Sequence, residues 1–253
     1  MDESELSRLF ERALEAGRGR NYPEAVRLLQ ELLVRTDQLP EALLYLGRSY
    51  HALREFPRAV QALLLFLNFQ PGSAAGHFFA GRSYFALGML AQALHHLRRS
   101  VQLDPSFPPA LGLLGLAALK TGRLKTAVGF FEQALKLDPE NPQLFNGYLN
   151  ALLTQAIRQF GRRQYDQARE LLLSIQKHRP ASLVVHLYLA SIYRELGEAE
   201  LALRQWGEAS RLAPQDPIFH LQRAAVHLQR GDSRGALAAL EEASRYLGGG
   251  KAL

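Results

Sequence analysis

The sequence predicts an all-α fold, a solenoid in which helix pairs stack one after another. First, a small residue in the second helix of each pair recurs every 34 residues, with one interval of 41: Ala25, Ala59, Ala93, Ala127, Ala168, Ala202 and Ala236. Second, a bulky residue follows four positions later in each copy: Leu29, Leu63, Leu97, Phe131, Leu172, Trp206 and Leu240. Third, each copy ends near a helix stop, which contains Pro in five of the seven: Pro71, Pro105, Pro139, Pro180 and Pro214. Helix pairs of this kind cannot bury their apolar faces alone, so they stack on their neighbours.

The segment from Pro108 to Asn141 shows the pattern most clearly. Two apolar helical patterns lie on either side of a break at Gly122-Arg123. Small residues, Gly115 in the first helix and Ala127 in the second, occupy the points where two helices must touch. The apolar content of 47% is ample for a core that runs as a strip between helix layers.

The period, the small–aromatic–small spacing and the closing proline resemble the tetratricopeptide repeat family. The fourth repeat carries the resemblance best, with these residues in family positions: Leu114, Gly115, Gly122, Ala127, Phe131, Ala134 and Pro139. The resemblance implies a right-handed α-solenoid of seven stacked helix-turn-helix repeats, and we expect residues 1–253 to form a single solenoid. The first-helix Trp of the family is replaced in six repeats by Leu43, His77, Leu111, Phe145, His186 and His220. We expect these histidines to fill packing positions, with a metal or pH role as the alternative.

The first four repeats are expected at about 6–39, 40–73, 74–107 and 108–141. The first helix of repeat one is apolar on one side only, as an end cap facing water should be. The second helices of repeats one and two open at Tyr22-Pro23 and Phe56-Pro57, because Pro is well tolerated in a first helical turn. Repeats three and four are regular and turn at Gly88 and Gly122.

The fifth repeat, residues 142–182, is longer than the others, and its first helix is expected to run on to Gly161. Seven extra residues are close to two helical turns, so the apolar stripe stays in phase. One interpretation is a lengthened helix covered by neighbouring turns. The other is a second interaction surface for a partner or another copy, formed by Ala156, Ile157, Phe160, Arg162 and Arg163.

Repeats six and seven are expected at 183–216 and 217–250, turning at Gly197 and Gly231, and the sequence then closes on Gly248 to Leu253. Arrays of this family usually end in an extra helix that covers the last apolar face, and the sequence shows none. Two interpretations follow: the uncapped end forms a homo-oligomer, or the chain is a segment of a longer protein.

The sequence contains no catalytic pattern. Phosphate-binding loops, H-E-x-x-H, G-x-S-x-G and G-x-G-x-x-G are all absent. There is no cysteine, so there is neither a disulfide nor a thiolate site, and we expect no metal and no cofactor. The sequence therefore indicates a non-enzymatic protein.

A ligand groove is implied by the resemblance, because the family holds extended peptides or partner helices on the concave face of its first helices. At 100° per residue, this face lies nearly opposite the packing face. Carried over residue by residue, the groove consists of Leu44, Arg48, His51, Phe78, Arg82, Phe85, Gly112, Leu116, Asn146, Asn150, Leu187, Ser191 and Arg194. The arginines favour a ligand that carries an acidic group beside apolar residues. Repeats two to four lack the paired Lys and Asn of the carboxylate clamp that some family members use for chaperone tails.

Charge and targeting signals limit the class of partner. The net charge of +6 is modest and well mixed with acids, which makes nucleic acid an unlikely partner. Arginines gather at the turns within repeats and acids at the turns between them, and helix-end electrostatics explains both. The alternative is an anionic partner on this basic rim, which consists of Arg18, Arg20, Arg54, Arg58, Arg123, Lys125, Arg162, Arg163, Arg194, Arg230 and Arg234. The sequence shows neither a transmembrane run nor a signal-peptide core, so a cytoplasmic location is the default expectation.

These observations predict a protein–protein interaction adaptor or scaffold that binds a peptide or helix of a partner. The alternatives are a targeting or regulatory segment of a longer protein, a self-assembling scaffold and, more weakly, binding of nucleic acid or lipid by the basic rim.

Overall fold

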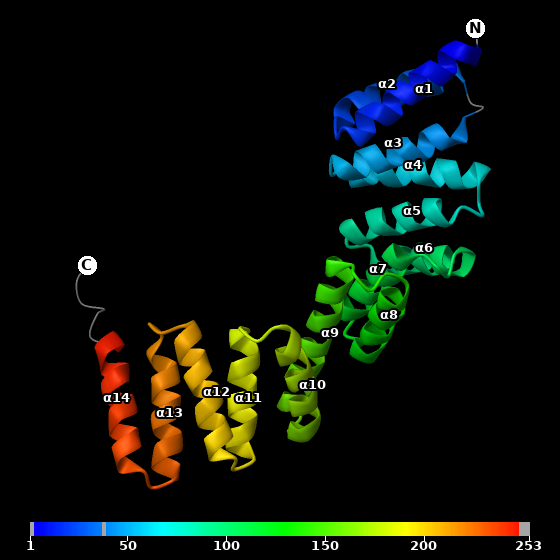
Figure 1. The fold of residues 1–253 in the computed structure, drawn as a ribbon. Coiled ribbons are helices and arrows are strands. Elements are labelled where there is room, and N and C mark those ends of the chain that lie inside the picture. The colour runs from blue at the N-terminus through cyan, green and yellow to red at the C-terminus, as the bar shows by residue number, and fades with distance from the viewer. Residues whose placement is uncertain (1–2, 37–38, 248–253) are drawn as a thin grey trace. The chain divides into compact units, whose positions relative to one another are not determined.

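The computed structural model describes residues 3–36 and 39–247, and all regular structure in this part of the chain is α-helical (Figure 1). The chain divides into two compact units, Met1–Tyr148 and Leu149–Leu253. The single solenoid over residues 1–253 stays a prediction. The C-terminal segment from Gly248 to Leu253, on which the uncapped-end interpretation partly depends, lies outside the described residues.

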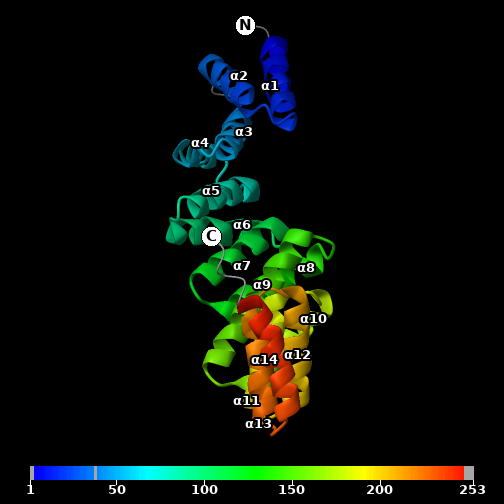
Figure 2. The same cartoon turned by 90° about the vertical axis from the view of Figure 1, so that its left-hand side faces the viewer.

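The first unit consists of four helix pairs that stack in chain order (Figures 1 and 2). The pairs are α1 (Glu3–Arg18) with α2 (Tyr22–Arg35), α3 (Pro40–Ala52) with α4 (Phe56–Phe69), α5 (Ala74–Ala86) with α6 (Leu90–Leu103), and α7 (Pro108–Lys120) with α8 (Leu124–Leu137). Helix α9 (Pro142–Gly161) begins in this unit and ends in the second. It has 20 residues, compared with 13 in α7.

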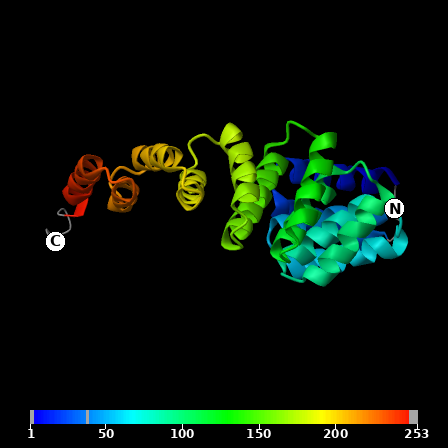
Figure 3. The ribbon, with the colours of Figure 1, turned by 90° about the horizontal axis from the view of Figure 1, so that it is seen from below.

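The second unit continues the pairing, and its last four helices lie side by side (Figure 3). They follow α10 (Tyr165–His178) and are α11 (Leu183–Glu195), α12 (Ala199–Leu212), α13 (Pro217–Gln229) and α14 (Ser233–Leu247). The fourteen helices of the described residues thus form seven consecutive pairs. This confirms the all-α solenoid of helix-turn-helix repeats.

Glycine in the first helix of a pair accommodates the bulky residue of the second. A Cβ added at Gly47 would lie 2.5 Å from Leu63 Cγ, and one added at Gly115 would lie 2.8 Å from Phe131 Cε2. Atoms this close would overlap, so the helices can approach only because the side chain is absent. The recurring small residues of the sequence are therefore the contact points of the stack.

The turn within every repeat places one residue in the left-handed backbone region. These residues are Arg20, Arg54, Gly88, Gly122, Arg163, Gly197 and Gly231, with φ between 60° and 77°. The following residue donates its N–H to a carbonyl five residues back, as Met89 does to Tyr84 at 2.9 Å. This is a Schellman-type helix end, which glycine adopts without strain. Three repeats close the same turn with arginine.

Two of the three histidines at the family's tryptophan position bridge to the end of the preceding repeat. His77 Nε2 donates to the carbonyl of Pro71 at 3.1 Å, and His186 Nε2 donates to that of Pro180 at 2.8 Å. His220 is buried and instead contacts Glu242 through Nδ1 at 3.0 Å. His77 also contacts His96 of α6 at 3.0 Å, and His186 contacts Gln205 of α12 at 2.7 Å, so all three histidines join the two helices of their repeat.

The last described helix, α14, presents an exposed apolar face. Leu240, at the bulky position of repeat seven, is 41% exposed, whereas Trp206 at the same position of repeat six is 5% exposed. Trp206 stacks on Phe219 of the next helix, with ring centroids 6.4 Å apart. Leu237 and Leu247 are also exposed. Within the described residues, no further helix covers this face.

Candidate interaction site

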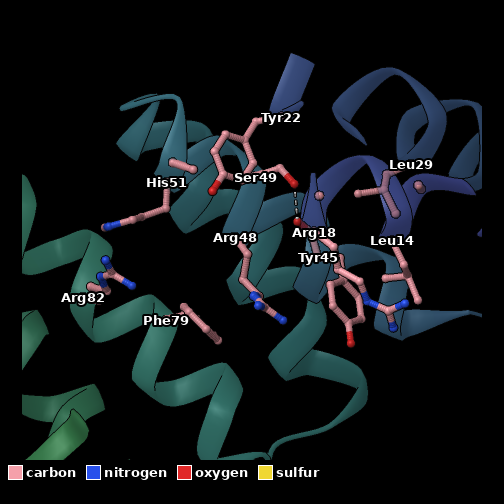
Figure 4. A pocket seen from close by; sticks show the side chains of 13 residues that line it. Leu14, Arg18, Tyr22, Leu29, Tyr45, Arg48, Ser49, His51, Phe79 and Arg82 are labelled. Atoms are coloured by element: carbon pink, nitrogen blue, oxygen red, sulfur yellow. Dashed lines mark hydrogen bonds between the residues drawn. The ribbon is translucent and has the colours of Figure 1, made fainter. Parts of the chain in front are cut away.

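A cavity of about 360 Å³ opens among α1, α2, α3 and α5 (Figure 4). It is lined by Ala13, Leu14, Gly17, Arg18, Tyr22, Leu29, Tyr45, Arg48, Ser49, His51, Ala52, Phe79 and Arg82. Three of these side chains are guanidinium groups, and none of the described lining residues carries a carboxylate. We call this the cationic cavity.

Arg48 is held between two aromatic rings. Its Cζ lies 4.9 Å from the ring centroid of Tyr45, one turn earlier in α3, and 4.9 Å from that of Phe79 in α5 (Figure 4). Tyr45 is in turn packed edge-on against Phe10, with centroids 5.8 Å apart. Because a planar guanidinium stacks well on ring faces, these contacts orient Arg48 before any ligand arrives.

His51 is a neutral member of the cationic cavity. Its Nδ1 lies 3.0 Å from Ser83 Oγ, and that hydroxyl donates its own hydrogen to the carbonyl of Phe79. The hydroxyl therefore accepts from Nδ1–H, which leaves Nε2 unprotonated. Burial, together with the positive charge of Arg82, lowers the pKa of His51 to about 4. The charge of the cavity near pH 7 is thus that of its arginines.

A second cavity of about 350 Å³ lies in the same unit and is mainly apolar. It is lined by Phe78, Arg82, Pro109, Gly112, Leu113, Leu116, Phe131, Asn141, Gln143 and Leu144. A Cβ at Gly112 would overlap Leu144 Cδ2, so glycine permits the close approach of α7 to α9. Arg82 lines both cavities. We call this one the apolar cavity.

The structure brings together part of the groove expected from the sequence. Arg48, His51 and Arg82 meet in the cationic cavity, and Phe78, Arg82, Gly112 and Leu116 line the apolar cavity. Three predicted groove residues of the first unit line neither cavity: Leu44, Phe85 and Asn146. Leu44 packs against the core, Lys120 Nζ lies 4.4 Å from the ring of Phe85, and Asn146 is exposed.

Sequence reasoning missed several residues that line the cationic cavity. Tyr45 and Phe79 each stand one position after a predicted groove residue and three before an arginine. This helical spacing brings the Tyr45 ring to Arg48, whereas the Phe79 ring contacts Arg48 from the next repeat. This aromatic-x-x-Arg recurrence was the available signal. Arg18 and Tyr22 lie at the turn of repeat one, outside the predicted groove positions.

The expected groove residues of the second unit make contacts within that unit. Asn150 Oδ1 accepts from Arg179 at 3.3 Å, and Ser191 Oγ donates to the carbonyl of Leu187 at 2.9 Å. Arg194 donates to Gln222 at 2.9 Å and pairs with Glu195 at 3.2 Å. Their role as ligand residues stays a prediction.

The expected second interaction surface is partly covered within the chain. Ala156 is fully buried and Ile157 is half-buried. Phe160 packs edge-on against Tyr188 of α11, with centroids 5.3 Å apart. Arg162 and Arg163 are exposed. The exposed part of this surface is therefore its arginine pair, and whether a partner binds there stays a prediction.

Comparison with known proteins identifies the family. The tetratricopeptide repeat family matches residues 10–74, 80–142 and 153–217, and a second tetratricopeptide repeat family matches residues 217–242. The chain belongs to the tetratricopeptide repeat family. No curated protein matches the sequence.

Solved structures of tetratricopeptide repeat proteins share the fold. One is the C-terminal part of a repeat protein from Cytophaga hutchinsonii, with 15% identity, 92% of this chain and 93% of that chain covered, and a TM-score of 0.68. Another comes from Parabacteroides merdae, with 16% identity, coverages of 95% and 93%, and a TM-score of 0.58. A chain of the APC/C hetero-tetramer Cut9–Hcn1 has 19% identity, coverages of 86% and 42%, and a TM-score of 0.51. At these identities the likeness extends to the fold alone.

The described tetratricopeptide repeat helices include no group of three or more His, Cys, Asp or Glu residues that could hold a metal ion. Among the same residues, every helix is too short or too polar to cross a bilayer.

Several arginines of the basic rim are paired, including Arg58 with Glu55 at 2.7 Å and Arg230 with Glu200 at 2.6 Å.

Proposed function

We propose that this tetratricopeptide repeat protein is a non-enzymatic adaptor whose groove in the first unit binds a segment of a partner protein. The observation that carries the proposal is the sharing of Arg82 by the cationic cavity and the apolar cavity. Two cavities of opposite chemistry that meet at one residue suit a ligand with an acidic group near an apolar side chain. Membership of a family of interaction modules supports the proposal.

The groove supplies both parts of such an interface. Arginine and aromatic residues are enriched in protein–protein interfaces, and Arg48 with its two rings combines them in one place. Leu116 at the apolar cavity is 41% exposed, so a ligand side chain that covered it would remove apolar surface from water. One similar fold is part of a hetero-tetramer of two different proteins, as expected of an interaction module.

The test is selection of a random peptide library on the immobilised protein. We expect enriched peptides to pair acidic residues with an apolar residue. The enrichment should be lost in the double variant Arg48→Glu/Arg82→Glu and reduced in Leu116→Glu. The double variant Arg162→Glu/Arg163→Glu changes the charge equally in the turn that follows α9 and is the matched control. Loss of enrichment only in this control would place the site at that turn and refute the groove.

A further inference from the structure

The three arginines of the cationic cavity have no carboxylate partner among the described residues. Arg18, Arg48 and Arg82 have no acid among their described contacts, and no acidic side chain lines the cavity. Elsewhere, ion pairs join Arg27 to Glu24, Arg58 to Glu55, Arg169 to Asp166 and Glu198, Arg211 to Glu208, Arg223 to Glu242, and Arg230 to Glu200. Like charges gathered in a cavity without acids repel one another and favour an anionic ligand.

We infer that the cationic cavity binds a group carrying two negative charges, presented by the partner segment as a phosphorylated side chain or as two adjacent carboxylates. The inference rests on the proposed function and names the ligand of the same groove. A single carboxylate would leave two of the three positive charges uncompensated. Arginine forks match phosphate and carboxylate oxygens in a bidentate geometry, which suits both forms of the ligand.

The geometry of the cavity is already set for such a group. Arg48 is stacked between Tyr45 and Phe79, so little of its freedom is lost on binding. Arg82 reaches the same cavity from α5 and also borders the apolar cavity. A ligand residue near the doubly charged group would therefore meet Phe78 and Leu116. The recognised sequence would carry a bulky apolar residue close to the dianion.

The experiment compares labelled peptides that are identical except at one site, which holds serine, phosphoserine or a Glu-Glu pair, with leucine at varied spacing beside it. Binding to the full chain is measured by fluorescence anisotropy. We expect the phosphoserine peptide, the Glu-Glu peptide or both to bind at least about tenfold more tightly than the serine peptide. Which of the two binds identifies the source of the charge. Equal binding of all three peptides would overturn the inference.

Variants test whether the effect belongs to the cavity. Arg48→Gln and Arg82→Gln should each weaken binding of the doubly charged peptide by about tenfold, as expected for a lost charge-assisted contact. Arg98→Gln removes the same charge from an exposed site on α6 outside both cavities and should change little. Equal loss in all three variants would reveal nonspecific attraction and refute the site. Circular dichroism and thermal midpoints would verify that each variant is folded.

Pyrophosphate, tested alone, separates this inference from the proposed function. It should raise the thermal midpoint of the wild-type chain and not that of Arg48→Gln or Arg82→Gln. Pyrophosphate binding without binding of any peptide would support the dianion site and refute the peptide groove. Peptide binding that depends on Leu116 but not on the arginines would support the groove and overturn the dianion site.

Discussion

Three of the seven repeats close their internal turn with an arginine in the left-handed region, and replacing Arg54 with glycine should stabilise the protein. Arg54 has φ +63°, and the same position holds Gly88 and Gly122 in the next two repeats. The left-handed conformation costs a non-glycine residue about 1–2 kcal/mol. Glycine raises the entropy of the unfolded chain, which costs roughly 0.5–1 kcal/mol. The difference predicts that Arg54→Gly adds about 0.5–1 kcal/mol to the free energy of unfolding.

The assay is urea denaturation followed by circular dichroism, together with the thermal midpoint. A gain of this size should raise the midpoint by about 1–4 °C for a chain of this length. Arg54→Ala is the matched control, since alanine removes the same charge but keeps the strain, and it should leave stability nearly unchanged. The converse variant Gly122→Ala should lose about 1 kcal/mol or more. If Arg54→Gly were neutral and Gly122→Ala harmless, backbone strain would not limit these turns.

Two further predictions concern acid sensitivity and the bulky residue in the second helix of each repeat. Burial, the first cause in both residues, lowers the pKa of His51 and of His96 from 6.5 to about 4. Between pH 6.5 and about 4 the unfolded chain therefore binds more protons than the folded chain. The contribution of these neutral histidines to the free energy of unfolding is complete above pH 6.5 and is lost as the pH falls towards 4. The thermal midpoint should decline less in this window for His51→Gln and His96→Gln than for wild type, and parallel profiles would contradict the assignment. Phe131→Ala should cost about 3–5 kcal/mol, because its side chain is fully buried, whereas Leu240→Ala at the same repeat position should cost under about 1 kcal/mol, because that side chain is 41% exposed. Equal losses in urea denaturation would show that the last repeat is covered in solution.

The repeat fold could be predicted from the sequence because its contacts depend on residue size at fixed positions. Gly115 must be small for Phe131 to pack, and this requirement recurs with the period of the stack. The pairing of helices followed from that recurrence alone. The arginines in the left-handed turns could not be predicted in this way, because most residues at turn positions give no sign of their φ angle. Only the four glycines marked the turn.

The candidate site was predicted in part, and the limit has a physical cause. Helical phase identifies which residues leave the packing face, and it selected Arg48, His51 and Arg82. It does not show which neighbours close over them, because a cavity depends on the side chains of several successive helices. Tyr45 and Phe79 were missed for this reason, although they orient Arg48. The expected groove residues of the first unit meet in the two cavities, whereas Asn150, Ser191 and Arg194 make contacts within the second unit.

Packing and binding place opposite demands on the first helices of this unit. The packing face needs small residues at fixed points, whereas the opposite face can carry charges at little cost to stability, because Arg48 and Arg82 remain partly in water. Burial keeps His51 neutral at neutral pH, which prevents a fourth positive charge beside Arg82. The remaining charge is compensated by no acid of the described cavity. An unbalanced charge does not assist folding, so its presence on a face that packing leaves free is best explained by a ligand of opposite sign.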